Sequence, residues 1–117
     1  MRDKQPWIDY CLTLPGAYED YPFDDPDWTI LRRQGNRKIF AMLFHLQGRL
    51  CLNLKCDPMQ ADFWRRVYQG RVVPGYHMNK VHWNTVYLDA GLEVETVHEM
   101  IAHSYELICP KRKTHIK

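Results

Sequence analysis

The sequence predicts an α+β domain, in which helices pack on one face of an antiparallel sheet. Three observations carry this prediction. Strand-like segments joined by short loops precede a helix, another strand follows, and a further helix comes last. The 117 residues contain no repeat and no long linker, so we expect one domain over residues 1–117. Hydrophobic residues make up 45% of the chain and aromatic residues 13%, which is enough for one packed core.

The first third of the chain is expected to hold a helix, an acidic connector and a strand. Apolar residues recur at helical spacing over 6–14, and Pro15-Gly16 ends that helix. Residues 17–26 are acidic and aromatic, with a short strand at their start. Residues 28–34 have the composition of a strand, and Gln34-Gly35-Asn36 then forms a turn.

Two consecutive strands should form the centre of the sheet. Residues 37–46 include a run that is apolar on both faces, as in a central strand. Gln47-Gly48 has the form of a two-residue hairpin loop. Residues 49–56 alternate between two faces. We expect a core face formed by Leu50, Leu52, Leu54 and Cys56, and an opposite, at least partly solvated face formed by Arg49, Cys51, Asn53 and Lys55.

The clearest helix start lies at Asp57-Pro58-Met59-Gln60. Asp57 suits the N-cap position, Pro58 suits the first helical position, and Gln60 is placed to bond back to the cap. Gly70 is expected to end this helix. An apolar row at a spacing of four should form its buried stripe: Met59, Phe63 and Val67.

The last third is expected to be irregular over 71–82, a strand over 83–89 and a helix over 93–108. Pro110 ends that helix, and a basic tail follows. The apolar side chains of the helix fit one wide stripe, formed by Val94, Val97, Met100, Ile101, Tyr105 and Ile108.

The net charge of +2 hides a strong segregation of charge along the chain. Residues 1–31 carry −5, residues 32–82 carry +8, residues 83–110 carry −5 and residues 111–117 carry +4. If folding gathers the cations of 32–82 on one face, that face attracts polyanions. The alternative is a solvated basic face that acidic neighbours balance.

Membrane and secretory signals are absent from the sequence. No apolar run approaches the roughly 18 residues of a membrane span, and no run of the signal-peptide type follows the N-terminus. We therefore expect a cytoplasmic protein, which we also expect to be a monomer. Its four cysteines are expected to be reduced thiols, mostly buried.

The sequence contains no recognisable catalytic or metal-binding motif. Cys51 and Cys56 point to opposite faces of a strand, so they do not share a metal. His98 and His103 are five residues apart, which separates them by roughly 140° around a helix. Ser104 lies mid-helix, and neither a nucleophile elbow nor a glycine-rich phosphate loop is present. We expect no enzyme activity, no cofactor and no metal.

The basic central block offers phosphate-binding groups interleaved with aromatic rings. Lysine and arginine neutralise phosphates, asparagine and histidine donate hydrogen bonds to them, and an indole ring can stack. Trp83 alone is more often a core residue, and His77 and Asn79 can instead satisfy backbone groups of a long loop. The candidate nucleic-acid contacts are Arg32, Arg33, Arg37, Lys38, Lys55, Arg65, Arg66, Arg71, His77, Asn79, Lys80, His82 and Trp83.

Four segments together resemble the MmcQ/YjbR family of small bacterial proteins. They are the run from Pro74 to Val86 with the sequence PGYHMNKVHWNTV, Leu54-Lys55-Cys56-Asp57-Pro58 before a helix, Ser104-Tyr105 in the last helix, and Leu14 to Ala17. Tyr21-Pro22-Phe23 also fits many members. The motif positions carried onto this chain are Lys55, Pro74, His77, Asn79, Lys80, His82 and Trp83.

The resemblance implies a fold similar to bacterial frataxin (CyaY-like) and the family's usual description as DNA-binding, which leans on fold similarity. The frataxin-like fold also raises iron binding, through Glu19, Asp20, Asp24 and Asp25. Frataxins place their acids on the first helix, where this chain has only Asp3 and Asp9. We therefore retain the expectation that no metal binds.

The function expected from all this is non-catalytic DNA binding, through phosphate contacts and without sequence-specific readout. The first alternative is a protein-interaction module whose basic face meets an acidic partner. The second is a small-molecule or enzymatic role in a pocket lined by His77, His82 and Trp83.

Overall fold

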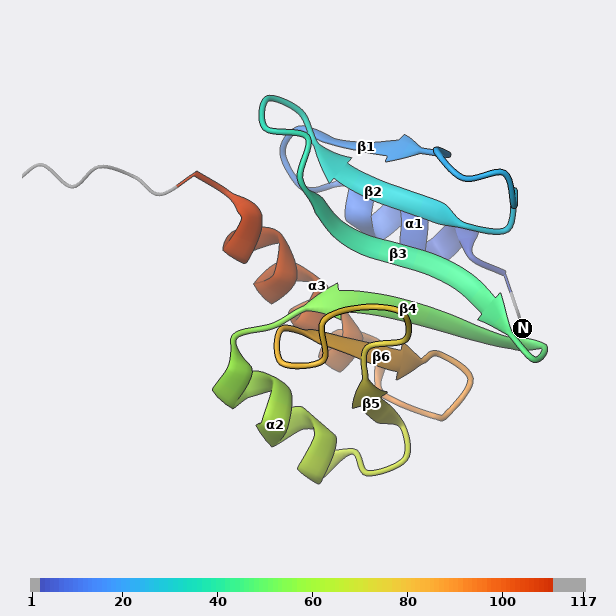
Figure 1. Cartoon of the computed structure of the whole chain (residues 1–117), viewed down its shortest axis with the longest axis vertical. Coiled ribbons are helices and arrows are strands. Elements are labelled where there is room, and N and C mark those ends of the chain that lie inside the picture. Colours follow the sequence, from blue (N-terminus) through green and yellow to red (C-terminus); the bar gives the residue numbers. More distant parts are fainter. Residues whose placement is uncertain (1–2, 111–117) are drawn as a thin grey trace, which may run out of the picture.

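The computed structural model describes residues 3–110, so the basic tail at 111–117 lies outside the described residues. Within 3–110 the strands form one antiparallel six-stranded sheet in the order β1-β2-β3-β4-β6-β5 (Figure 1). The α+β prediction is therefore confirmed. The helices are α1 (Gln5–Leu12), α2 (Pro58–Val67) and α3 (Val94–Ile108). The strands are β1 (Ala17–Asp20), β2 (Thr29–Arg33), β3 (Ile39–Leu46), β4 (Arg49–Lys55), β5 (Val72–Pro74) and β6 (Trp83–Tyr87).

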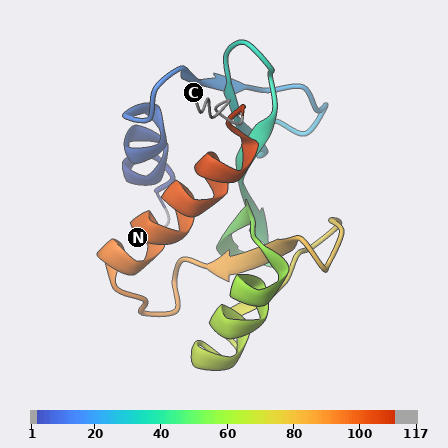
Figure 2. The ribbon, with the colours of Figure 1, turned by 90° about the vertical axis from the view of Figure 1, so that its left-hand side faces the viewer.

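One hydrophobic core lies between the helices and one face of the sheet. It joins the inward residues of β4 to side chains from all three helices, such as Cys11, Trp64 and Ile101. Figure 2 shows α1 and α3 on the same side of the sheet. The expected inner face of residues 49–56 is confirmed, because Leu50, Leu52, Leu54 and Cys56 are all buried.

The hairpin between β3 and β4 forms as the sequence predicts. Leu46 pairs with Arg49, which leaves Gln47 and Gly48 as the two-residue loop. Both loop residues have positive φ angles, 53° at Gln47 and 78° at Gly48. Such loops match the right-handed twist of the strands that they join.

The opposite face of β4 is more buried than the alternating sequence pattern of residues 49–56 predicts. Cys51 and Asn53 are fully buried, so the expectation that they are partly solvated is wrong. The segment 75–82 folds across this face. The Asn53 amide donates to the carbonyl of Tyr76 at 3.0 Å, and the Tyr76 ring stacks on Phe44 with 5.8 Å between ring centroids. This loop replaces water as the cover of the central strands.

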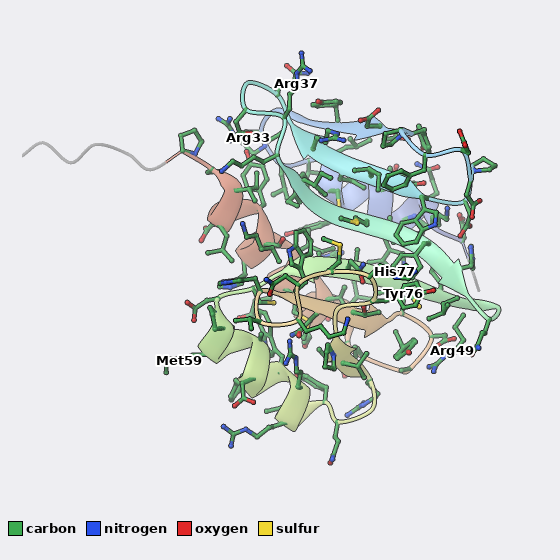
Figure 3. The ribbon with its side chains drawn as sticks, in the orientation of Figure 1. Arg33, Arg37, Arg49, Met59, Tyr76 and His77 are labelled. Atoms are coloured by element: carbon green, nitrogen blue, oxygen red, sulfur yellow. The ribbon has the colours of Figure 1, made fainter. Side chains whose placement is uncertain are left out.

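The buried face of α2 differs from the prediction. Met59, Phe63 and Val67 have exposed fractions of 82%, 52% and 50%, whereas Ala61 and Trp64 are buried. Figure 3 shows Met59 pointing away from α2 into solvent. The rotation of α2 is fixed by tertiary contacts, since the Trp64 ring meets His103 edge to face and Arg65 bonds to β6.

The two ends of α2 also differ from the prediction, though by less than its buried face does. Pro58 occupies the first turn as expected, but the Asp57 side chain makes no capping hydrogen bond. Instead the Asp57 N–H donates to Nε2 of His103 at 3.2 Å. The helix ends at Val67 with Tyr68 as its C-cap, three residues before the predicted stop at Gly70.

Two further differences lie late in the chain. Residues 72–74, expected to be irregular, form β5 at the edge of the sheet. Val94 is 49% exposed because it begins α3, whereas the other members of its predicted stripe are buried.

Candidate nucleic-acid interface

Three of the candidate cations lie at the turn that joins β2 to β3. The Arg37 N–H donates to the carbonyl of Arg33 at 2.8 Å, and the Arg33 N–H donates to the carbonyl of Lys38 at 3.1 Å. Arg37 and Lys38 are exposed and Arg33 is half-buried. Arg37 has a φ of 60°, in the left-handed region that residues other than glycine seldom adopt. Figure 3 shows Arg33 and Arg37 at this end of the molecule.

Asn36 fixes this turn to the end of α3. Its side-chain oxygen accepts the Lys38 N–H at 3.1 Å, and its amide nitrogen donates to the carbonyl of Ile108 at 2.8 Å. A turn of a few residues is thereby held against the protein body. The pattern of residues 34–36 predicted a turn but gave no sign of this long-range contact.

Lys55 ends β4 at the same end of the sheet. The last register pair between β3 and β4 is Ala41 with Leu54, so Lys55 follows the last paired residue of β4 near the start of β3, and on its other side it pairs with Trp83 of β6. Within residues 3–110 its ammonium group has no ion pair. We call Arg33, Arg37, Lys38 and Lys55 the basic hairpin edge.

Other candidate cations are paired with carboxylates. The Arg32 Nε lies 2.7 Å from Asp20, and Arg32 also donates to the carbonyl of Arg37 at 2.9 Å. Arg66 pairs with Asp62 one helical turn earlier, at 2.6 Å. These two arginines add little net charge to the surface where they lie.

Arg65 hydrogen-bonds to the start of β6 and to the loop that precedes it. It donates to the side-chain oxygen of Asn84 at 2.6 Å and to the carbonyls of Lys80 and Trp83. Its guanidinium therefore joins α2 to the residues around the start of β6.

The loop between β5 and β6 is also held by its own polar side chains. The Lys80 ammonium donates to the carbonyl of Gly75 at 2.7 Å. Asn79 accepts the N–H groups of Val81 and His82 at 2.9 and 3.3 Å. For Asn79 the expectation that it satisfies loop backbone is confirmed. Much of the segment that carries the family resemblance thus has a structural role.

Gly75 shows why this segment needs a glycine. Its N–H donates to the carbonyl of Trp83 at 2.9 Å, and a Cβ atom on Gly75 would lie 2.7 Å from the Trp83 Cβ. Real Cβ atoms do not approach so closely. Trp83 itself is half-buried, in register with Lys55. His77 and His82 are exposed, and the His77 ring lies tilted against Tyr76.

The candidate residues do not form one continuous surface. The β2–β3 turn, which carries Arg33, Arg37 and Lys38, lies at one end of the long axis, and α2, which carries Arg66, lies at the other (Figure 1). Lys55 lies between them, at the end of β4 and three residues before α2 begins. Arg71, which follows α2, holds its guanidinium over the Tyr68 ring at 5.4 Å. A pocket lined by His77, His82 and Trp83, the second alternative above, stays a prediction, because the pocket that the structure shows in the described residues is lined by other residues.

A shallow pocket opens beside the β2–β3 turn. It has a volume of about 280 Å³ and is lined by Tyr18, Gln34, Gly35 and Arg37. Of these, only Arg37 was a candidate from the sequence. Tyr18 joins it through the pairing of β1 with β2, which places Tyr18 opposite Arg32. No local pattern in the sequence indicates that pairing.

Three of the four cysteines, Cys11, Cys51 and Cys56, are buried thiols, and Cys109 is half-buried. Burial raises the pKa of Cys11 and of Cys56 to about 12 and that of Cys51 to about 11, so all three are protonated at neutral pH. All four cysteines are free. Among residues 3–110 no three His, Cys, Asp or Glu side chains come together as metal ligands. No described helix has the length and apolar character to cross a membrane.

The fold defines a small α+β protein built on a six-stranded antiparallel sheet. The sequence profile of the YjbR family matches residues 12–107. The chain is 31% identical to YjbR of Escherichia coli (strain K12) over 99 residues, which span 85% of this chain and 80% of that protein. It is 33% identical to YbdF of Escherichia coli O157:H7 over 84% of this chain and 77% of YbdF. The chain belongs to the YjbR family, the MmcQ/YjbR-like family that its motifs indicated.

Solved structures agree with this assignment. A crystal structure of the Deinococcus radiodurans protein DR2400 superposes with a TM-score of 0.83 at 32% identity, covering 92% of this chain and 79% of that one. A crystal structure of a Pseudomonas syringae protein gives a TM-score of 0.79 at 29% identity, covering 90% of this chain and 97% of that one.

Proposed function

We propose that this protein binds DNA without catalysis, by holding backbone phosphates at the basic hairpin edge. One observation carries the proposal. Arg33, Arg37 and Lys38 lie at the β2–β3 turn and Lys55 at the end of β4. None of the four has a carboxylate partner among the described residues. A cluster of cations without internal partners attracts a polyanion and releases its counterions.

Several of the candidate residues are less suited to contact phosphate, because protein groups already occupy their polar atoms. Arg65, Asn79 and Lys80 already use their polar groups within the protein. Arg32 and Arg66 are neutralised by Asp20 and Asp62. The remaining candidates are proposed to contact the DNA only at the periphery of the site: Arg71, His77, His82 and Trp83. With about four phosphates neutralised, log affinity should fall against log salt with a slope of about −4.

Matched double variants test the proposed site. Arg37→Gln with Lys38→Gln removes two charges at the basic hairpin edge, whereas Arg66→Gln with Arg71→Gln removes two charges at and after α2. Both variants have the same net charge, so any difference reports the position of the charges. We expect the first variant to flatten the salt slope by about 2 and to weaken binding, and the second to bind almost as the wild type does.

Fluorescence anisotropy with a labelled DNA duplex at several salt concentrations measures both quantities. Equal losses in the two variants would show that binding has no defined site. No binding at low salt, or binding without salt dependence, would refute the proposal.

A protein-interaction module is the second candidate function, and the exposed apolar row on α2 favours it. Met59, Phe63 and Val67 lie four residues apart on one side of the helix. Aligned exposed apolar side chains commonly mark a surface that meets another protein. Arg66, three residues after Phe63, is paired with Asp62, so an acidic group of the partner would replace that carboxylate. A partner captured by wild type but not by Phe63→Gln would support this function.

Three further proposals concern the context of the protein. The first is a CyaY-like topology, supported by an antiparallel sheet between an N-terminal and a C-terminal helix; superposition on a CyaY structure tests it. The second is a cytoplasmic location, supported by four free cysteines and tested by cell fractionation. The third is a monomeric state, tested by light scattering.

A further inference from the structure

The pocket at the β2–β3 turn combines three kinds of chemical group. Tyr18 supplies a half-buried aromatic ring, Gln34 an amide, and Arg37 a guanidinium. Within residues 3–110 these three side chains make no hydrogen bond or ion pair with the rest of the protein. Their polar groups are therefore available to a ligand.

Gly35, in the pocket wall, leaves room for the Arg33 side chain. It has a φ of 96° and no side chain, and a Cβ atom here would lie 3.3 Å from Nη1 of Arg33. That guanidinium donates to the carbonyl of Gln34 at 3.0 Å, so a second cation stands beside the pocket. A larger residue than glycine would be strained in this backbone conformation and would crowd Arg33.

The backbone at Arg37 is held in an uncommon conformation. Its φ of 60° is kept by two hydrogen bonds, from its own N–H to Arg33 and from the Arg32 guanidinium to its carbonyl at 2.9 Å. Strained residues of this kind concentrate where a protein positions a side chain for binding. Here the residue with the strained backbone carries a guanidinium that lines the pocket.

An aromatic ring, an amide and guanidinium groups match the parts of a nucleotide. A ring stacks on a base, an amide meets the hydrogen-bonding edge of the base, and guanidinium groups bind phosphate. In a duplex both faces of each base are already stacked, so a paired base enters such a pocket only after it is flipped out. An unpaired strand meets no such cost.

We propose that the pocket formed by Tyr18, Gln34, Gly35 and Arg37 binds an unpaired nucleotide of single-stranded DNA. This inference rests on the proposed DNA-binding function and specifies its ligand. The base stacks on Tyr18, and the phosphate lies between Arg37 and Arg33. The remainder of the basic hairpin edge follows the neighbouring phosphates.

Variants at Tyr18 test the stacking contact. Anisotropy is measured with a labelled oligothymidine strand and with a duplex of equal length. The wild type is expected to bind the single strand more tightly. Tyr18→Leu should weaken single-strand binding by about tenfold and change duplex binding by less than about twofold, because stacking one base is lost. Tyr18→Phe keeps the ring and should bind the strand as the wild type does.

A second measurement uses the wild-type protein, in case Tyr18→Leu fails to fold. Photo-cross-linking with a strand that contains 5-iodouracil should attach the base to the peptide that holds Tyr18, as identified by mass spectrometry. Thymidine monophosphate should compete far less well than the strand, since it offers one phosphate only. Equal competition would show that the ligand is a free nucleotide and would overturn the proposal.

The outcomes separate this inference from the function on which it rests. Salt-dependent duplex binding that Arg37→Gln with Lys38→Gln weakens, together with no effect of Tyr18→Leu and no cross-link, overturns the pocket and leaves the proposed function standing. Preference for the duplex overturns it likewise. Absence of binding to either DNA at low salt overturns both.

Discussion

Ser104 shows how one hydroxyl can complete a sheet. The last register pair of β3 and β4 is Ala41 with Leu54. One residue further along, the Lys55 N–H donates to Oγ of Ser104 at 2.9 Å, and that hydroxyl donates to the carbonyl of Phe40 at 2.6 Å. The side chain thus bridges two backbone groups that have no direct bond and ties α3 to both strands.

We expect Ser104→Ala to lower the free energy of unfolding by about 3 kcal/mol, because it leaves a donor and an acceptor unsatisfied in a fully buried position. Urea denaturation measures this change. Thr13→Ala is the control, since the Thr13 hydroxyl also bonds to a carbonyl but is exposed. A loss at Ser104 no greater than that at Thr13 would show that water replaces the hydroxyl.

The helices show which parts of the fold a local pattern can predict. In α3 the apolar residues form one stripe, so periodicity alone identifies the buried face. In α2 two rows compete: Met59, Phe63 and Val67 lie four apart, while Ala61 and Trp64 form a second helical row. Both rows are apolar, so the sequence pattern does not show which of them is buried.

Long-range contacts decide between the two rows. The indole of Trp64 packs against His103 of α3, and Arg65, next in the chain, bonds to β6. These partners lie 39 and 19 residues away in the sequence. The candidate site likewise depends on long-range contacts that local sequence patterns do not predict. The cations were recognisable in the sequence, but the carboxylates and carbonyls that neutralise some of them, and the Tyr18 wall of the pocket, depend on pairings between distant segments.

Substitutions on the two rows of α2 should therefore differ strongly. Phe63→Gln is expected to change the free energy of unfolding by less than about 0.5 kcal/mol, because the ring is half-exposed. Trp64→Ala is expected to cost about 3 kcal/mol or more, because it empties a buried site. Urea denaturation of both variants gives the comparison. Similar losses would mean that both rows are buried in solution, for example within an assembly.

At the scale of the whole molecule, the acidic segments neutralise part of the basic central segment. Asp20 pairs with Arg32 and Asp89 pairs with Arg49, so each acidic segment meets one arginine of residues 32–82. Arg33, Arg37, Lys38 and Lys55 have no such carboxylate partner among the described residues. The described chain ends at Pro110, two residues beyond Ile108, whose carbonyl bonds to Asn36 of the β2–β3 turn. Four basic residues follow Pro110 in the sequence, within 111–117.

Removal of residues 111–117 should consequently weaken DNA binding without unfolding the domain. If these cations contact phosphates next to the edge, the slope of log affinity against log salt becomes less steep by up to about 3. Anisotropy titrations of the shortened chain, alone and with Arg37→Gln and Lys38→Gln, measure the two contributions. Because both sets of charges act on one stretch of backbone, their losses in slope should add. An unchanged slope after truncation would confine the phosphate contacts to the folded domain, and a complete loss would move the site from the edge to the tail.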